Sequence, residues 1–199
     1  MSQSSYDTDS SIGLHPVTHK ISAPHWITPM KGHRLAAGCE IRNWLEDTGS
    51  LTKKVREACD GRFSVQVRRQ GSGKCLYDEA RLLDITRTRY AVIREVELCC
   101  DATAWIFART IIPMKSLSGP ARRLTMLGNK PLGAVLFADP SVHRGQTQFA
   151  HLHPGQELFD TAVVGLSERP DSLWGRRTLF YLAGKPLLVN EIYLPGIPL

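Results

Sequence analysis

Two pairs of short segments alternate apolar and polar residues with a period of two, and this pattern constrains the fold more than any other feature of the chain. The segments are residues 90–98 and 105–113, followed by residues 176–182 and 187–194. Alternation places successive side chains on opposite faces of a strand, and a short turn between two such segments is typical of a β-hairpin. The chain is therefore expected to form two antiparallel hairpins, the first of them turning at Asp101-Ala102.

Helices are expected around these strands. One is predicted from about Leu35 to Asp47, and Ser50 is a suitable N-cap for a second helix from Leu51 to about Cys59. Two shorter helices are predicted at residues 118–128 and 131–137. Strands that connect as hairpins and carry helices on the resulting sheet indicate an α+β fold with an antiparallel sheet.

Three further segments complete the assignment. Residues 63–68 alternate with period two and are predicted to form another strand. The glycines at residues 71–74 predict a turn. Residues 138–172 show no clear pattern and are predicted to be irregular.

The length and composition favour one folded domain behind an N-terminal tail. The 199 residues are 42% hydrophobic and 22% charged, which is ordinary for a globular domain. Residues 1–11 contain five serines and two aspartates but no aliphatic residue. We therefore expect residues 1–33 to be disordered or extended and residues 34–199 to form a single domain. No run of 18 uncharged apolar residues exists, so no membrane insertion is expected.

The charge balance gives little support to a nucleic-acid-binding function. The chain has 25 Lys and Arg residues against 19 Asp and Glu residues, a net charge of +6. The positive residues are scattered, whereas a nucleic-acid-binding face requires clustered basic residues with aromatic ones. A small anionic substrate is compatible with the same balance. We expect a monomer with no nucleic-acid partner.

The cysteines point to a reduced, cytoplasmic protein. Their number is five, which is odd, and none of them forms a CxxC pair. Disulfide frameworks in small secreted domains use even numbers of cysteines. The sequence therefore predicts incidental free thiols.

The most informative residues are three charges that lie where the strand pattern requires apolar residues. Arg94 shares a strand face with valines and a leucine, and Arg109 shares one with aromatic and aliphatic residues. Glu191 occupies a similar position in the last strand. A buried charge without a partner is costly, so each of the three requires a counter-charge or a ligand.

The predicted turn at Asp101-Ala102 would place Arg94 directly opposite Arg109. Two opposed arginines repel each other unless anions lie between them, and guanidinium groups bind carboxylates with paired hydrogen bonds. Two interpretations follow. One is a purely structural Arg–Glu–Arg network completed by Glu191. The other is a cavity for a small, partly apolar dianion. A loop longer or shorter by one residue would place the arginines on opposite faces and remove this argument.

Three other signals are weak. His151 and His153 would project from one side of a strand, but no third ligand with suitable spacing accompanies them, so no metal site is expected. The glycines before Lys74 lack the spacing of a phosphate-binding loop. The start of the helix at Leu132 offers free backbone N–H groups that suit a carboxylate, although an ordinary helix start is by far the commoner case.

The same residues resemble the chorismate lyase family. The resemblance rests on several short strings in order, from about residue 35 to the C-terminus. They are Asp47-Thr48-Gly49-Ser50-Leu51-Thr52, Ile93-Arg94-Glu95-Val96, Ala108-Arg109-Thr110-Ile111-Ile112-Pro113, Leu127-Gly128-Asn129-Lys130-Pro131-Leu132-Gly133, Leu173-Trp174-Gly175-Arg176-Arg177 and Gly184-Lys185-Pro186-Leu187-Leu188-Val189-Asn190-Glu191. Residues 1–33 and about 140–170 lie outside the resemblance.

The resemblance implies a fold and a reaction. Family members have an antiparallel sheet with helical flaps over a buried ligand pocket. They cleave chorismate to 4-hydroxybenzoate and pyruvate without a metal or an organic cofactor, as the first committed step toward ubiquinone. Chorismate would thus be the substrate and 4-hydroxybenzoate the product that the protein binds.

The resemblance also implies roles for individual residues. Arg94 and Arg109 match carboxylate-binding arginines, and Glu191 matches an active-site glutamate. Leu132 matches a backbone contact to the ligand, and Leu51 matches a position that lines the pocket. We expect Arg94 to hold the ring carboxylate, Arg109 to stabilise the departing enolpyruvyl group, and Glu191 to act as the general acid or base.

A ligand-sensing domain of the same fold is the main alternative. Effector domains of some transcription regulators resemble this fold and would keep the anion pocket without catalysis. Such regulators carry a DNA-binding segment of about 60–70 residues in front of the domain, whereas about 33 residues precede the first predicted helix here. The enzyme is the favoured interpretation.

Overall fold

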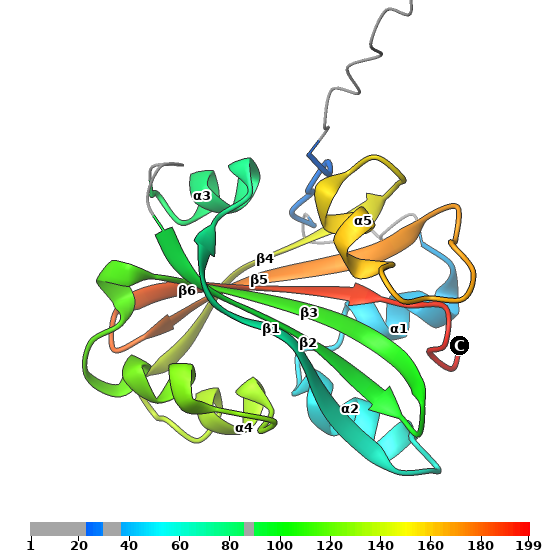
Figure 1. Cartoon of the computed structure of the whole chain (residues 1–199), viewed down its shortest axis with the longest axis horizontal. Coiled ribbons are helices and arrows are strands. Elements are labelled where there is room, and N and C mark those ends of the chain that lie inside the picture. The colour runs from blue at the N-terminus through cyan, green and yellow to red at the C-terminus, as the bar shows by residue number, and fades with distance from the viewer. Residues whose placement is uncertain (1–22, 30–36, 86–89) are drawn as a thin grey trace, which may run out of the picture.

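The computed structural model describes residues 23–29, 37–85 and 90–199, and its centre is a six-stranded antiparallel sheet (Figure 1). The strands are β1 (Phe63–Lys74), β2 (Tyr90–Cys100), β3 (Thr103–Pro113), β4 (Val142–Leu152), β5 (Leu173–Leu182) and β6 (Lys185–Tyr193). Their order across the sheet is β1-β2-β3-β6-β5-β4. The two halves of the sheet meet where β3 pairs with β6, which places the two predicted hairpins side by side.

Helices cover both faces of the sheet, so the α+β class predicted from the sequence is confirmed. The α-helices are α1 (Cys39–Leu45), α2 (Leu51–Ala58), α3 (Tyr77–Leu82), α4 (Leu132–Leu136) and α5 (Glu157–Ala162), and the 3-10 helices are η1 (Met114–Ser116) and η2 (Gly119–Met126). Figure 1 shows α3 and α5 on one face of the sheet and α1, α2 and α4 on the other. The Ser50 side chain accepts a hydrogen bond from the Lys53 N–H, as expected for the N-cap of α2.

Two sequence assignments are wrong. Residues 71–74 continue β1 instead of forming a turn, because each of them pairs with a residue of β2. Residues 138–172 are not irregular, since they contain β4 and α5. Pairing with β5 and packing of the α5 apolar residues on the sheet stabilise this region, and neither interaction is visible in the local sequence.

The register between β2 and β3 differs from the predicted one by one residue. Arg94 pairs with Thr110, and Glu95 pairs with Arg109. The register shifts by one residue between Leu98 and Cys99. Strand pairs that are assigned by counting outward from the turn at Asp101-Ala102 are therefore wrong beyond Cys99. Because neighbouring residues on a strand face opposite sides, Arg94 and Arg109 lie on opposite faces of the sheet. The predicted opposition of the two arginines is therefore wrong.

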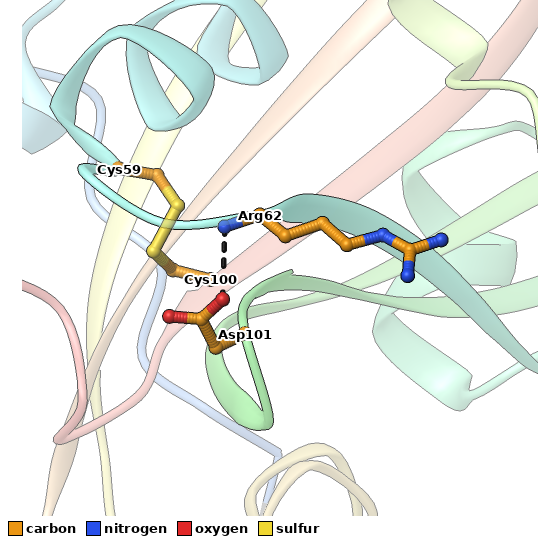
Figure 2. The surroundings of a disulfide bond; sticks show 4 residues. All are labelled: Cys59, Arg62, Cys100 and Asp101. Carbon is orange, nitrogen blue, oxygen red and sulfur yellow. Dashed lines mark hydrogen bonds between the residues drawn. A yellow bond between two sulfur atoms is a disulfide. The ribbon is translucent and has the colours of Figure 1, made fainter.

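The expectation that all cysteines are free is also wrong. Cys59, just after α2, forms a disulfide with Cys100 at the end of β2, and Figure 2 shows this bond. Pairing of Phe63 with Cys100 brings the two cysteines to a Cα–Cα distance of 5.6 Å across 41 residues of sequence. Beside the disulfide, the Arg62 N–H donates to the Asp101 carboxylate at 2.9 Å. The end of α2 is thus held to the β2–β3 turn. Cys39, Cys75 and Cys99 are free.

Part of the predicted tail lies against the sheet. Ile27 forms an isolated antiparallel bridge with Phe149 of β4, and the Trp26 indole N–H donates to Asp78 at 2.8 Å. The rest of the predicted tail, residues 1–22 and 30–33, lies outside the described residues. None of the helices that the structure describes combines the length and the apolar character needed to cross a membrane.

Candidate active site

A small cavity lies between the sheet and the helices α2 and α4. Strands β1, β2, β3, β5 and β6 form its floor, and β4 contributes Arg144 at the edge. The lining residues are Gly49, Ser50, Leu51, Thr52, Val65, Arg94, Val96, Leu98, Ala108, Thr110, Pro131, Leu132, Gly133, Leu136, Phe137, Arg144, Thr178, Phe180, Val189 and Glu191. Its volume is about 60 Å³. A cavity that holds one buried water has a volume of roughly 10–15 Å³, so this cavity has room for only a few waters. A ring-sized ligand therefore requires α2 and α4 to move apart.

Arg94 is the buried cation of this cavity. Its side chain is 2% exposed and donates hydrogen bonds to Gln70 Oε1 and to the Lys130 carbonyl oxygen. Among the described residues, no carboxylate forms an ion pair with it. Burial lowers the pKa of Arg94, because the charged form loses hydration. A buried guanidinium that has only neutral partners is suited to bind an anionic ligand.

Glu191 faces the same cavity from β6. Arg176 Nε donates to Glu191 Oε2 at 2.7 Å, so the counter-charge of Glu191 is Arg176 rather than either arginine predicted from the sequence. No hydrogen bond from the described part of the chain reaches Glu191 Oε1. This oxygen remains available to a ligand or a proton.

Arg176 also holds the C-terminal end of α1 to the sheet. Its Nη1 donates to the Leu45 carbonyl oxygen at 3.1 Å and to the Asp47 carbonyl oxygen at 2.5 Å, at the end of α1. The neighbouring side chains of Arg176 and Arg177 are both buried. Arg177 lies on the opposite face and forms an ion pair with Asp78 at 2.8 Å.

Leu51 and Leu132 both line the cavity, at the first residues of α2 and α4. Ala108 lines the floor of the cavity. These short helices begin at the cavity because Ser50 caps α2 and Pro131 precedes α4, and proline suits the start of a helix.

Arg109 lies outside the cavity, on the face covered by α3. Its guanidinium forms ion pairs with Glu79 of α3, at 2.9 Å, and with Glu95 of β2. Glu79 is fully buried and also accepts hydrogen bonds from Asn190 Nδ2 and from the Leu76 N–H. Burial raises the pKa of Glu79, and the nearby Arg109 opposes that shift. This network corresponds to the structural interpretation of the buried charges, with Glu79 in the place expected for Glu191.

The two histidines considered as metal ligands pack with each other and with an aromatic ring. His151 stacks on Trp174 with ring centroids 4.6 Å apart, and His153 contacts His151 edge-on. No cluster of three or more potential metal ligands occurs within residues 23–29, 37–85 and 90–199.

Comparison with known proteins identifies the family. Residues 25–198 match the family model described as chorismate lyase. The chain belongs to the chorismate lyase family.

Curated relatives agree with this assignment. A "Probable chorismate pyruvate-lyase" of Nitrosospira multiformis is 40% identical over 156 residues, which cover 78% of this chain and 87% of that protein. A protein of the same name from Methylococcus capsulatus is 40% identical over 162 residues, covering 79% of this chain and 96% of the relative. Both matches cover most of the length of either protein.

Solved structures share the fold at low identity. The effector domain of PhnF from Mycobacterium smegmatis is 13% identical, with a TM-score of 0.55, over 74% of this chain and 89% of that domain. The longer PhnF structure has the same TM-score over 75% of this chain and 65% of that one. At this low identity the likeness shows a shared fold alone.

Two arginines of this chorismate lyase family member were not predicted as site residues. Arg176 was named only within a string that resembles the family, and Arg144 lies in the segment predicted to be irregular. The string Trp174-Gly175-Arg176-Arg177 was available as a signal, because strand alternation places Arg176 and Glu191 at positions that pair across β5 and β6. Arg144 had no comparable signal.

Proposed function

We propose that this protein converts chorismate to 4-hydroxybenzoate and pyruvate. The observation that carries the proposal is the buried Arg94 guanidinium, which has no carboxylate partner among the described residues and shares an apolar cavity with Glu191. Membership of the chorismate lyase family and relatives named probable chorismate pyruvate-lyase support it.

The reaction needs little chemistry from the protein. The bond between the ring carbon and the enolpyruvyl oxygen breaks, and the adjacent ring carbon, which carries the hydroxyl group, loses its proton. The ring becomes aromatic, and the enolpyruvate takes up a proton at its methylene carbon to give pyruvate. Aromatisation supplies the driving force, so positioning and charge stabilisation are the main contributions of the site.

In this proposal Arg94 binds the ring carboxylate with its guanidinium. Glu191 is the general acid or base, since Arg176 holds one of its oxygens and leaves the other facing the cavity. Leu51 forms part of the wall, and the backbone of Leu132 contacts the ligand. We assign Arg109 a structural role, because its neighbours Ala108 and Thr110 line the cavity while its own side chain faces away.

The proposal extends to the cellular role. The product would enter ubiquinone synthesis as its first committed intermediate, and the reaction would proceed without a metal or an organic cofactor. The protein would act as a cytoplasmic monomer. A disulfide is unusual in the cytoplasm. Cell fractionation with rapid thiol alkylation would measure the location of the protein and the state of Cys59 and Cys100 together.

The direct test mixes purified protein with chorismate and a chelator and follows 4-hydroxybenzoate by absorbance and chromatography. Wild-type turnover together with loss of product in Arg94→Ala is the expected result. Binding of 4-hydroxybenzoate without turnover would instead favour a ligand-sensing domain of the same fold. Absence of both turnover and binding would overturn the proposed function.

A further inference from the structure

The proposed substrate carries two carboxylates, and Arg94 accounts for one of them. Two cationic side chains line the cavity within the described residues, Arg94 and Arg144. Arg176 is engaged by Glu191, and Arg109 faces the other side of the sheet. We propose that Arg144 binds the enolpyruvyl carboxylate of the substrate, a role that rests on the proposed function and names a second specificity-determining residue for it.

The fold directs the Arg144 side chain toward the cavity. Arg144 pairs with Phe180 on β5, and residues that pair across neighbouring strands project from the same face. Phe180 is itself part of the cavity wall. The register of β4 shifts between Arg144 and Thr147, a bulge that places both residues on the face of their partners in β5. Bulges of this kind re-aim side chains next to functional sites.

The present partners of Arg144 are neutral. Its Nη1 donates to the Thr48 carbonyl oxygen at 2.6 Å, and its Nη2 donates to the Gly49 carbonyl oxygen at 3.2 Å. Its guanidinium carbon lies 5.8 Å from the ring centre of Phe137 and 5.4 Å from that of Phe180. None of the carboxylates in the described ranges forms an ion pair with it. The guanidinium thus lies near two aromatic rings and has carbonyl partners that a ligand carboxylate can replace.

The charges around the cavity match a dianion. Arg94, Arg144 and Glu191 line the cavity, and Glu191 forms an ion pair with Arg176. Asp47 forms an ion pair with Lys54 at 3.2 Å. Two positive charges therefore remain uncompensated, and a substrate with two carboxylates neutralises both. Burial lowers the pKa of Arg144, and repulsion by Arg176 lowers it further, while Glu191 and Asp47 oppose the shift only in part. A ligand carboxylate beside Arg144 would add to the effect of these two acids.

With Arg144 in this role, the substrate and the product make different contacts with the protein. Arg144 lies at the exposed edge of the cavity, and Arg94 lies at the buried floor. Once the carbon–oxygen bond breaks, the carboxylate at Arg144 departs with pyruvate, and 4-hydroxybenzoate keeps only its contact with Arg94. The side chain that recognises the substrate therefore does not contribute to retention of the ring product.

The test compares Arg144→Gln and Arg144→Lys with wild type in kcat/KM for chorismate and in Kd for 4-hydroxybenzoate. Arg144→Gln should lower kcat/KM on the order of 100-fold, because a charge-assisted pair with the substrate is lost, and should change Kd by less than about threefold. Arg144→Lys should recover part of kcat/KM, since it keeps the charge but loses the paired geometry. Arg81→Gln is the matched control, because it removes an exposed arginine from α3 on the other face of the sheet.

The outcomes separate this inference from the proposed function. An equal loss of chorismate turnover and 4-hydroxybenzoate affinity in Arg144→Gln would mean that Arg144 acts only by holding residues 48–49, and it would overturn the inference. Unchanged kcat/KM would overturn it as well, with the proposed function intact. A wild-type protein that neither turns over chorismate nor binds 4-hydroxybenzoate would overturn both.

Discussion

Arg94 and Arg109 lie on neighbouring strands of one hairpin, yet their guanidinium groups are on opposite faces of the sheet. Arg94 faces a cavity and has only neutral partners, whereas Arg109 is enclosed by Glu79 and Glu95. The same residue type in the same hairpin thus serves two purposes. One arginine is available to a ligand, and the other ties α3 to the sheet.

Removing Arg109 should reduce stability. Arg109→Ala would leave Glu79 and Glu95 buried without their counter-charge, and breaking a buried pair in this way costs about 3–5 kcal/mol in the free energy of unfolding. Urea denaturation measures this loss. The affinity of the variant for 4-hydroxybenzoate, measured at low temperature where it is folded, should stay within a few-fold of wild type. A hundredfold weaker affinity with normal stability would contradict the structural role of Arg109.

Replacing Arg94 should have the opposite effect. Arg94→Met removes a buried charge that has no acidic partner in the described structure, so the free energy of unfolding should stay within about 1 kcal/mol of wild type or rise. Calorimetry should show that 4-hydroxybenzoate binds at least about 100-fold more weakly. Full affinity in this variant would remove Arg94 from the ligand site.

Glu191→Gln tests proton transfer. The amide oxygen can still accept the hydrogen bond from Arg176, so the position of the α1 end and the affinity for 4-hydroxybenzoate should change little. General acid or base catalysis contributes about 10²- to 10⁴-fold, and kcat for chorismate should fall by that amount. Steady-state kinetics measures the change. Turnover that is largely intact would leave Glu191 with a binding role only.

Loss of the disulfide should destabilise the fold. The Cys59–Cys100 bond closes a loop of 41 residues, and cross-links of this kind typically contribute about 2–4 kcal/mol. The double variant Cys59→Ala/Cys100→Ala should therefore melt at a lower temperature than wild type in a thermal scan. Cys39→Ala is the control, since Cys39 is an exposed free thiol. Equal melting temperatures for all three proteins would argue against a stabilising cross-link.

The free thiols should differ in reactivity. Burial raises the pKa of Cys75 to about 11, so about one thiol in a thousand is ionised at pH 8, and the thiolate is the reactive form. Alkylation of the native protein followed by mass spectrometry should label Cys39 rapidly and Cys75 slowly. Unfolding in denaturant should remove the difference. Rapid labelling of Cys75 in the native protein would contradict its burial beneath α3.

The sequence by itself determined the elements whose patterns are local. Alternation in 90–98, 105–113, 176–182 and 187–194 specified two hairpins, and Ser50 specified the start of α2. The sequence also marked Arg94 and Glu191 as charges in apolar positions, and both line the cavity. These features were accessible because strand periodicity and helix capping depend on residues that are close together in the chain.

The tertiary structure decided the features that depend on register and on long-range pairing. A shift between Leu98 and Cys99 separated Arg94 from Arg109, and a single residue of register exchanges the faces of a strand. Pairing of β5 with β6 gave Glu191 its partner Arg176, and the bulge in β4 brought Arg144 to the cavity. The contact between Cys59 and Cys100 likewise required β1 to pair with β2. Each of these contacts joins residues whose proximity comes from the assembled sheet, and local sequence does not encode it.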